Sequence, residues 1–170
     1  MSTKPETSQT SQTSQTTQVS DKRVPGVTAY LVCQDAEKAI AYYCDIFGAK
    51  EIYRLQMPDG MIGHAEIELA GGRFMLADEF KEMNILSPAS LGGSGVGLLI
   101  YVADADQVFD AAVKSGAVVF KEITEQFYGE RSGTIDDPFG HRWTIATRNE
   151  EISVAEIQSR FQDLYCDEDD

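Results

Sequence analysis

The chain has 170 residues, of which 42% are hydrophobic and 25% charged, and this length and balance suit one globular domain or two small fused modules. Its formal net charge of −14, from 14 Lys and Arg against 28 Asp and Glu, argues against nucleic-acid binding, which requires a basic surface. No apolar run comes near the roughly 18 residues that cross a bilayer, so we expect no membrane segment and no membrane partner.

The N-terminal residues 1–23 are rich in Ser, Thr and Gln and repeat the triplet TSQ. They contain almost nothing apolar to bury, which predicts a disordered tail. They also lack the apolar stretch of a secretory signal peptide, and the three cysteines of the chain are widely spaced with no CxxC pair. Both observations favour a cytoplasmic protein, with Cys33 and Cys44 as small core residues.

An internal repeat organises the residues that follow. Residues 24–78 align with residues 93–147 at a constant shift, with matching apolar strands and matching aspartates before each predicted helix. At the far end of the alignment, GGRFMLA at 71–77 falls on GHRWTIA at 140–146. The same shift at both ends indicates two copies of one supersecondary unit.

Each copy is expected to fold as a β-α-β-β-β unit. In the first copy, an apolar strand at 27–33 precedes a helix with Asp35 as its N-cap and Gly48 at its end, and three short strands follow. The second copy repeats this order with Asp104 as the N-cap, although the stretch QFYGERS before its last two strands looks irregular. One helix covers only one sheet face, so pairing two units leaves a concave groove, a common place for small-molecule sites.

We therefore predict an α+β fold in one domain at 24–148, flanked by the N-terminal tail. Its parts are a first module at 24–80, a linker at 81–95 and a second module at 96–148. A C-terminal helix at 149–166 and an acidic tail at 167–170 follow. The linker is rich in Gly and Ser and lacks the lysine of a phosphate-binding loop.

Three segments carry a resemblance to a known family: DAEKAIAYY at 35–43, PDGMIGHAEIELAGGRFMLADEF at 58–80, and QFYGERSGTIDDPFGHRW at 126–143. Together they resemble the vicinal oxygen chelate (VOC) superfamily, which includes glyoxalase I, extradiol dioxygenases, and fosfomycin- and bleomycin-resistance proteins. They are most similar to its PhnB-like branch. The resemblance implies two tandem βαβββ modules that form a cupped mixed sheet with a central groove, and it implies a homodimer.

In the metal-using members of that superfamily, the ligands come from the first and fourth strands of each module. The motif match carries these positions over to Thr28, Met75, Gly97 and Thr144. Glycine offers no side chain, methionine only a thioether, and threonine a weak neutral oxygen. We therefore expect no metal site and no cofactor.

Strand alternation indicates which side chains face the groove. Along IGHAEIEL, the apolar Ala65, Ile67 and Leu69 suit the helix-covered face, which turns His64 and Glu66 inward. His64 and Glu66 are therefore the candidate catalytic residues. The residues expected to bind a ligand are Tyr30, Met75, Tyr101, Tyr128, Arg131 and Thr144.

Two of these residues have an alternative interpretation. His64 is either a general base or ligand contact, or a strand histidine that is hydrogen-bonded to Glu66. Arg131 either clamps an anionic group from a loop over the groove, or pairs with Glu130 at the surface.

The main functional hypothesis is a metal-free protein that binds a small cationic or amphipathic molecule in the groove, in line with the acidic body and the groove tyrosines. The alternative is a VOC enzyme of the lyase, transferase or dioxygenase type that has an unconventional or absent metal site and uses His64 as acid/base. A third hypothesis is an interaction module in which residues 149–170 dock a partner.

Overall fold

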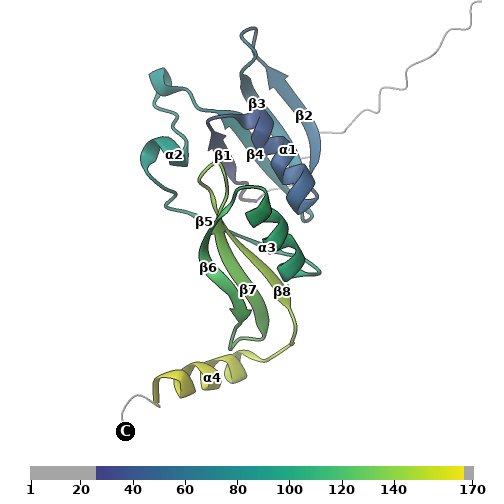
Figure 1. Cartoon of the computed structure of the whole chain (residues 1–170), viewed down its shortest axis with the longest axis vertical. Coiled ribbons are helices and arrows are strands. Elements are labelled where there is room, and N and C mark those ends of the chain that lie inside the picture. The colour runs from purple at the N-terminus through teal and green to yellow at the C-terminus, as the bar shows by residue number, and fades with distance from the viewer. Residues whose placement is uncertain (1–25, 167–170) are drawn as a thin grey trace, which may run out of the picture.

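The computed structural model describes residues 26–166, and of Tyr165 and Cys166 it describes the backbone only. The predicted tails at 1–23 and 167–170 lie outside the described residues. None of the described helices is long and apolar enough to span a membrane. The elements in chain order (Figure 1) are β1 (Tyr30–Cys33), α1 (Ala36–Phe47), β2 (Lys50–Gln56), β3 (Ile62–Leu69), β4 (Gly72–Asp78), the 3-10 helix η1 (Lys81–Met83), α2 (Pro88–Leu91), β5 (Gly97–Tyr101), α3 (Ala105–Lys114), β6 (Val118–Glu125), β7 (Glu130–Asp136), β8 (Arg142–Arg148) and α4 (Val154–Cys166).

Two four-stranded sheets, one in each module, form the frame of the molecule and confirm the predicted α+β fold of two βαβββ units. The first sheet has the strand order β1-β4-β3-β2, and the second has the equivalent order β5-β8-β7-β6. In each sheet the first strand pairs in parallel with the last, and the other pairs are antiparallel. Tyr30 lies beside Met75, and Leu99 lies beside Thr144 in the matching register.

Two strands, β1 and β7, begin more than one residue away from their predicted first residues. β1 starts at Tyr30 rather than at Val27, which is fully exposed. β7 starts at Glu130, inside the stretch predicted to be irregular. The cause is a tight turn in which the backbone N–H of Gln126 donates to the carbonyl of Glu130 at 2.7 Å. Gly129 within it has a φ of +81°, which only glycine adopts without strain.

Side chains fix the N-termini of α1 and α3, the helices that pack on the two sheets. Asp35 caps α1 by accepting a backbone N–H at 3.0 Å, as predicted. The last strand of the module supplies a second acceptor, because the carboxylate of Asp78 accepts the backbone N–H of Ala36 at 2.6 Å. Asp104 and Thr147 make the same two kinds of contact to α3. Each helix is therefore tied to its own sheet.

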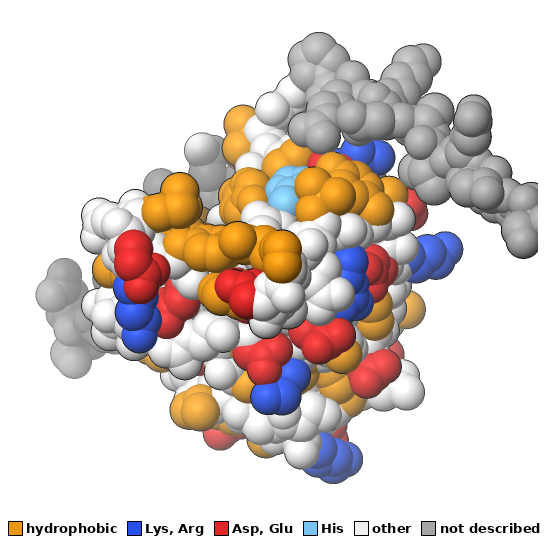
Figure 2. Space-filling view, turned by 90° about the horizontal axis from the view of Figure 1, so that it is seen from above, with side chains coloured by type: hydrophobic (Ala, Val, Ile, Leu, Met, Phe, Trp, Pro, Cys, Tyr) orange, Lys and Arg blue, Asp and Glu red, His pale blue; other side chains and the backbone are white. Residues whose placement is uncertain are grey.

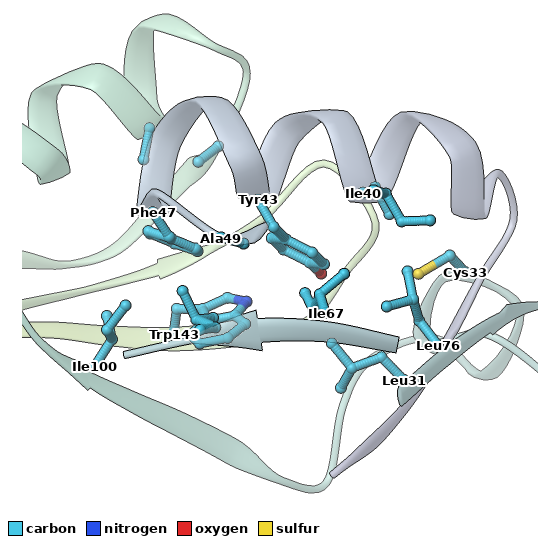
Figure 3. Packing of buried hydrophobic residues seen from close by; sticks show 14 of the residues in the cluster. Leu31, Cys33, Ile40, Tyr43, Phe47, Ala49, Ile67, Leu76, Ile100 and Trp143 are labelled. Carbon is cyan, nitrogen blue, oxygen red and sulfur yellow. The ribbon is translucent and has the colours of Figure 1, made fainter. Parts of the chain in front are cut away.

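One hydrophobic core joins the two modules (Figure 3). Trp143 of β8 packs against α1 of the other module, with its ring centroid 5.7 Å from that of Tyr43 and 4.9 Å from that of Phe47. It also lies 6.0 Å from the ring of Phe74 on β4. The modules are thus joined through their helix-covered faces.

The other face of each sheet, here called the open face, points away from α1 and α3. The apolar residues of β3 predicted to face the helix are all buried in the core. The side chains of Tyr30, Leu99 and Tyr101 lie on the open faces and stay about half exposed. At the far end of the second sheet, α4 projects from the body of the molecule (Figure 1), and the ring of Phe161 lies 5.7 Å from that of Phe127.

Candidate functional site

The most constrained polar group on the first open face is the carboxylate of Glu66, in the middle of β3. Its side chain is completely buried. Tyr53 on β2 donates its hydroxyl to Oε1 at 2.8 Å, and Arg73 on β4 donates from Nη1 to Oε2 at 2.7 Å. A buried carboxylate is tolerated only when its charge and its oxygens are matched in this way. These three side chains form a fixed polar floor.

His64 and Tyr30 extend the polar floor toward the surface. Nε2 of His64 lies 3.4 Å from Oε1 of Glu66, and Nδ1 lies 2.9 Å from the hydroxyl of Tyr30. Burial raises the pKa of Tyr30 above its usual value, so the phenol stays protonated at neutral pH. The view from above shows hydrophobic side chains gathered in patches between acidic and basic side chains (Figure 2). A carboxylate, an imidazole and a phenol are thus joined in one chain of polar contacts.

The second open face carries hydroxyl groups where the first carries charge. Thr134 takes the place of Glu66 in register, because Thr134 pairs with Thr144 as Glu66 pairs with Met75. The two threonine hydroxyls lie 3.1 Å apart. The two open faces therefore have the same backbone geometry and different chemistry.

Another polar group of the second open face lies close to α4. Tyr101 donates its hydroxyl to Glu130 at 2.8 Å, and Nη2 of Arg148 lies 3.5 Å from the same carboxylate. The hydrogen bond to Glu130 raises the pKa of Tyr101. Glu130 and Arg148 line a cavity of about 510 Å³ together with Tyr128 and with Ile157 of α4.

Arg131 lies on the helix-covered face of the second sheet, where it neither reaches over the groove nor pairs with Glu130, the two alternatives that the sequence left open. Its guanidinium binds both carboxylate oxygens of Asp106 on α3 at 2.6 Å. Because β7 already begins at Glu130, strand alternation turns Glu130 to the open face and Arg131 away from it. The structure therefore brings Tyr128 and Glu130 to the same cavity, whereas the side chain of Arg131 lies on the opposite face of the sheet.

The positions that correspond to the metal ligands of the resembled superfamily do not fit a divalent cation. Thr28 and Gly97 are exposed, and Met75 supplies only a thioether. The hydroxyl of Thr144 is engaged with that of Thr134. Between residues 26 and 166, no group of three or more His, Cys, Asp or Glu side chains is arranged to hold a metal ion. This donor set is a poor match for the carboxylate and imidazole ligands that such ions require.

Sequence reasoning missed a second buried polar network at the junction of the modules. Asp137 accepts hydrogen bonds from the Tyr43 hydroxyl at 2.7 Å, from the indole nitrogen of Trp143 at 3.0 Å, and from the backbone N–H of His141 at 2.9 Å. Burial alone raises the pKa of Asp137, but hydrogen bonding from His141 and from the Tyr43 hydroxyl brings it below its usual value. The DPFGHRW segment contains three of these residues, but nothing in it shows that Tyr43 of the other module completes the network.

The sequence and the fold match a known family along most of the chain. The sequence model of the Glyoxalase/Bleomycin resistance protein/Dioxygenase superfamily matches residues 25–145. The chain belongs to this superfamily. Membership confirms the resemblance to VOC proteins and agrees with the two βαβββ modules of this VOC chain.

The matches to similar proteins cover nearly the whole length of those proteins. An uncharacterized protein of Mycobacterium bovis is 36% identical over 138 residues, which cover 79% of this VOC chain and 91% of that protein. A PhnB protein from Bacillus cereus has a TM-score of 0.58 at 18% identity, and the match covers 72% of this chain and 99% of that one. The fosfomycin resistance protein FosX from Listeria monocytogenes, solved with Mn(II) and sulfate, has a TM-score of 0.59 at 16% identity, with 82% and 99% covered. These structural matches show the shared fold.

Proposed function

We propose that this VOC protein binds a small cationic or amphipathic organic molecule on its open sheet faces without a divalent metal. The observation that carries this proposal is the combination, on the first open face, of exposed aromatic surface with a rigid polar floor. The Tyr30 side chain is 49% exposed while its hydroxyl is held by His64, and Glu66 below it is completely buried. Mostly apolar surfaces with a few fixed polar groups are typical of small-molecule sites.

The electrostatics favour a cationic ligand over an anionic one. The chain carries a net charge of −14, which raises the local concentration of cations at its surface. The half-exposed rings of Tyr30 and Tyr101 offer π faces that attract a cation directly. The arginine predicted to clamp an anion, Arg131, is instead bound to Asp106.

A second copy of the chain is proposed to complete the groove. Leu99, Val118 and Phe120 lie on the second open face and are half exposed or more. Apolar side chains that gather on an exposed sheet face mark an interaction surface. A twofold axis can set the first open face of one copy opposite the second open face of the other, which would bury both.

Titration calorimetry with benzyltrimethylammonium, and with neutral benzyl alcohol for comparison, tests the ligand class. We expect the cation to bind more tightly, and Tyr30→Ala to weaken it about fivefold or more, since a desolvated cation–π contact contributes about 1–2 kcal/mol. Arg131→Gln, on the helix-covered face, is the matched control and should leave the affinity unchanged. Failure of both probes to bind, or equal losses in the two variants, would contradict the proposal.

Light scattering after size-exclusion chromatography tests the second copy. Leu99→Asp places a charge on the second open face and is expected to give a monomer. Met83→Asp changes an equally apolar but remote exposed residue on η1 and should leave a dimer. A wild-type chain that stays monomeric at high micromolar concentration would exclude a shared groove.

A second candidate, an enzyme that uses general acid–base catalysis, is favoured by the contacts that link Glu66, His64 and Tyr30. In it, His64 would exchange a proton with a substrate through or beside the Tyr30 phenol, and Glu66 would orient the imidazole. Elemental analysis of the wild type and of His64→Ala separates the two functions. Stoichiometric metal that disappears in the variant would favour an enzyme with an unconventional metal site, and its absence together with probe binding would favour the binding protein.

A further inference from the structure

A separate cavity of about 320 Å³ lies where the two modules meet. It is bounded by β1, by the linker that contains α2, by the start of the second module and by the turn before β8. Most of its wall is apolar and consists of the side chains of Leu86, Pro88, Leu91, Val96 and Leu98, with glycines between them. A cavity of this size can hold a small organic molecule, and apolar cavities bind such molecules readily.

Three residues with polar side chains line this junction cavity, and the hydroxyl groups of two of them already have partners. The hydroxyl of Tyr30 contacts Nδ1 of His64 at 2.9 Å. The hydroxyl of Ser94 donates to the carbonyl of Val96 at 2.8 Å. His141 is the third, and its side chain is almost entirely buried.

The surroundings of His141 determine which of its ring nitrogens carries the proton. The Tyr43 hydroxyl donates its single hydrogen to Asp137 at 2.7 Å. At the 3.3 Å contact between that hydroxyl and Nδ1 of His141, the phenol oxygen must therefore be the acceptor and Nδ1–H the donor. The Asp137 carboxylate, 3.7 Å from Nδ1, favours a proton on the same atom.

The other nitrogen of the ring is then the free group. In the neutral imidazole with a proton on Nδ1, Nε2 carries a lone pair and accepts a hydrogen bond. Nε2 has no hydrogen-bond partner in the described part of the chain and is not sealed from solvent. Because Nδ1 is turned toward Tyr43 and Asp137, Nε2 is the ring nitrogen left available at the cavity that His141 lines.

We propose that the junction cavity is a binding site for a small, mostly apolar molecule with one hydroxyl group, such as a phenol, which donates its hydrogen to Nε2 of His141. The apolar wall accommodates the carbon skeleton, and the single fixed acceptor selects for a donor. This site shares Tyr30 with the open-face site but differs from it in its other lining residues and in its polar acceptor, His141. Its ligand is neutral, whereas the open faces are proposed to prefer a cation.

Phenol and its methyl ether anisole form a matched pair for the test, because they share the ring and differ in the hydroxyl hydrogen. Amide NMR titration of the full-length chain should show phenol-induced shifts at Gly93, Gly95 and His141. Anisole is expected to bind at least about tenfold more weakly, because Nε2 would be left without a donor. Equal affinities, no phenol binding, or shifts confined to the open faces would overturn the proposal.

Two variants assign the binding to this cavity. His141→Phe removes the acceptor and should abolish the preference for phenol, but it also disturbs the Asp137 network. Leu91→Trp keeps that network and fills the cavity from the exposed helix α2, so it should abolish phenol binding. Val113→Trp, a similar change on α3 outside the cavity, should bind phenol normally. Phenol binding that survives Leu91→Trp would place the site elsewhere.

Discussion

The two open faces have the same strand order and register, but they differ in how deeply their charged side chains are buried. Arg73 on β4 and Arg142 on β8 occupy equivalent positions. Arg73 binds Glu66, whose side chain is completely buried, whereas Arg142 binds both oxygens of Asp136, whose side chain is 33% exposed. The two equivalent arginines therefore neutralise different kinds of carboxylate, a fully buried one in the first module and a partly exposed one in the second.

This difference shows where the chain has placed its polar chemistry. A buried ion pair adds little stability compared with well-packed apolar residues, so stability alone does not account for the one at Glu66. In the second module the places of His64 and Glu66 are taken by Ser132 and Thr134, and the fold is the same. The comparison indicates that the first open face holds its central ion pair on a buried carboxylate, whereas the second combines exposed apolar side chains with an ion pair that is partly exposed.

The largest expected change in the free energy of unfolding comes from truncating Trp143 or Phe74, the equivalent core residues of the two modules. Trp143 is almost completely buried against α1, whereas Phe74 is only partly buried. Trp143→Ala should lower the free energy of unfolding by about 3–5 kcal/mol, and Phe74→Ala by about half as much. Urea unfolding followed by circular dichroism measures both values. Equal losses would show that the two modules contribute alike to the shared core.

The next largest change in stability is expected from replacing Arg73, and the same substitution at Arg142 provides the comparison. Arg73→Met leaves the Glu66 carboxylate buried beside fewer donors and should cost about 3 kcal/mol at pH 7. Arg142→Met removes a partly exposed pair and the contact of its guanidinium with the Phe120 ring, and should cost about 1 kcal/mol. Chemical denaturation measures both, and the double variant Glu66→Leu/Arg73→Met should regain most of the stability lost in Arg73→Met. Similar losses in the two single variants would remove the distinction between the faces.

Much of this arrangement follows from sequence, and the remainder depends on tertiary packing. The repeat, the caps at Asp35 and Asp104 and the inward turn of His64 follow from local patterns that period and hydrogen bonding enforce. The convergence of Tyr53 on Glu66 does not follow, because a register shift in β2 between Glu51 and Tyr53 sets it.

The placement of Arg131 and the packing between modules were not predictable either. Strand alternation is exact only once the first residue of a strand is known, and β7 begins at Glu130, earlier than the composition indicated. The pattern of apolar residues in each module predicts a helix-covered face. It does not show that Trp143 of one module packs on α1 of the other.

A third prediction uses Asp137, which has no counterpart in the short turn between β3 and β4. The pKa of Asp137 is lowered in the folded state. Its contribution to the free energy of unfolding is therefore fully present above the pKa of the unfolded state, and it is lost as the pH falls through the pKa of the folded state. Asp137→Asn should cost about 2 kcal/mol near neutral pH, and this difference should shrink below about pH 4. Urea unfolding at several pH values measures it. A difference that grows on acidification would reverse the assigned direction of the pKa shift.

A fourth prediction compares adjacent tyrosines on α1. The Tyr43 hydroxyl links this helix to Asp137 of the other module, so Tyr43→Phe should cost about 1.5 kcal/mol. The Tyr42 hydroxyl is buried without a hydrogen-bond partner in the described structure, so Tyr42→Phe should be neutral or slightly stabilising. Thermal unfolding distinguishes the two. A loss in Tyr42→Phe comparable with that in Tyr43→Phe would mean that a partner for the Tyr42 hydroxyl exists in solution.

The smallest effect concerns the turn between β3 and β4, which is shorter than the turn between β7 and β8. Ala70 and Gly71 have φ values of +50° and +76°, the left-handed pair of a tight hairpin turn. Alanine is disfavoured there by about 1 kcal/mol, whereas asparagine adopts this conformation readily. Ala70→Asn should therefore raise the free energy of unfolding by about 0.5–1 kcal/mol, and the β-branched Ala70→Val should lower it. Thermal unfolding gives the sign of each change. If both variants shifted stability in the same direction, the left-handed geometry at Ala70 would not hold in solution, and turn strain would no longer distinguish the first module from the second.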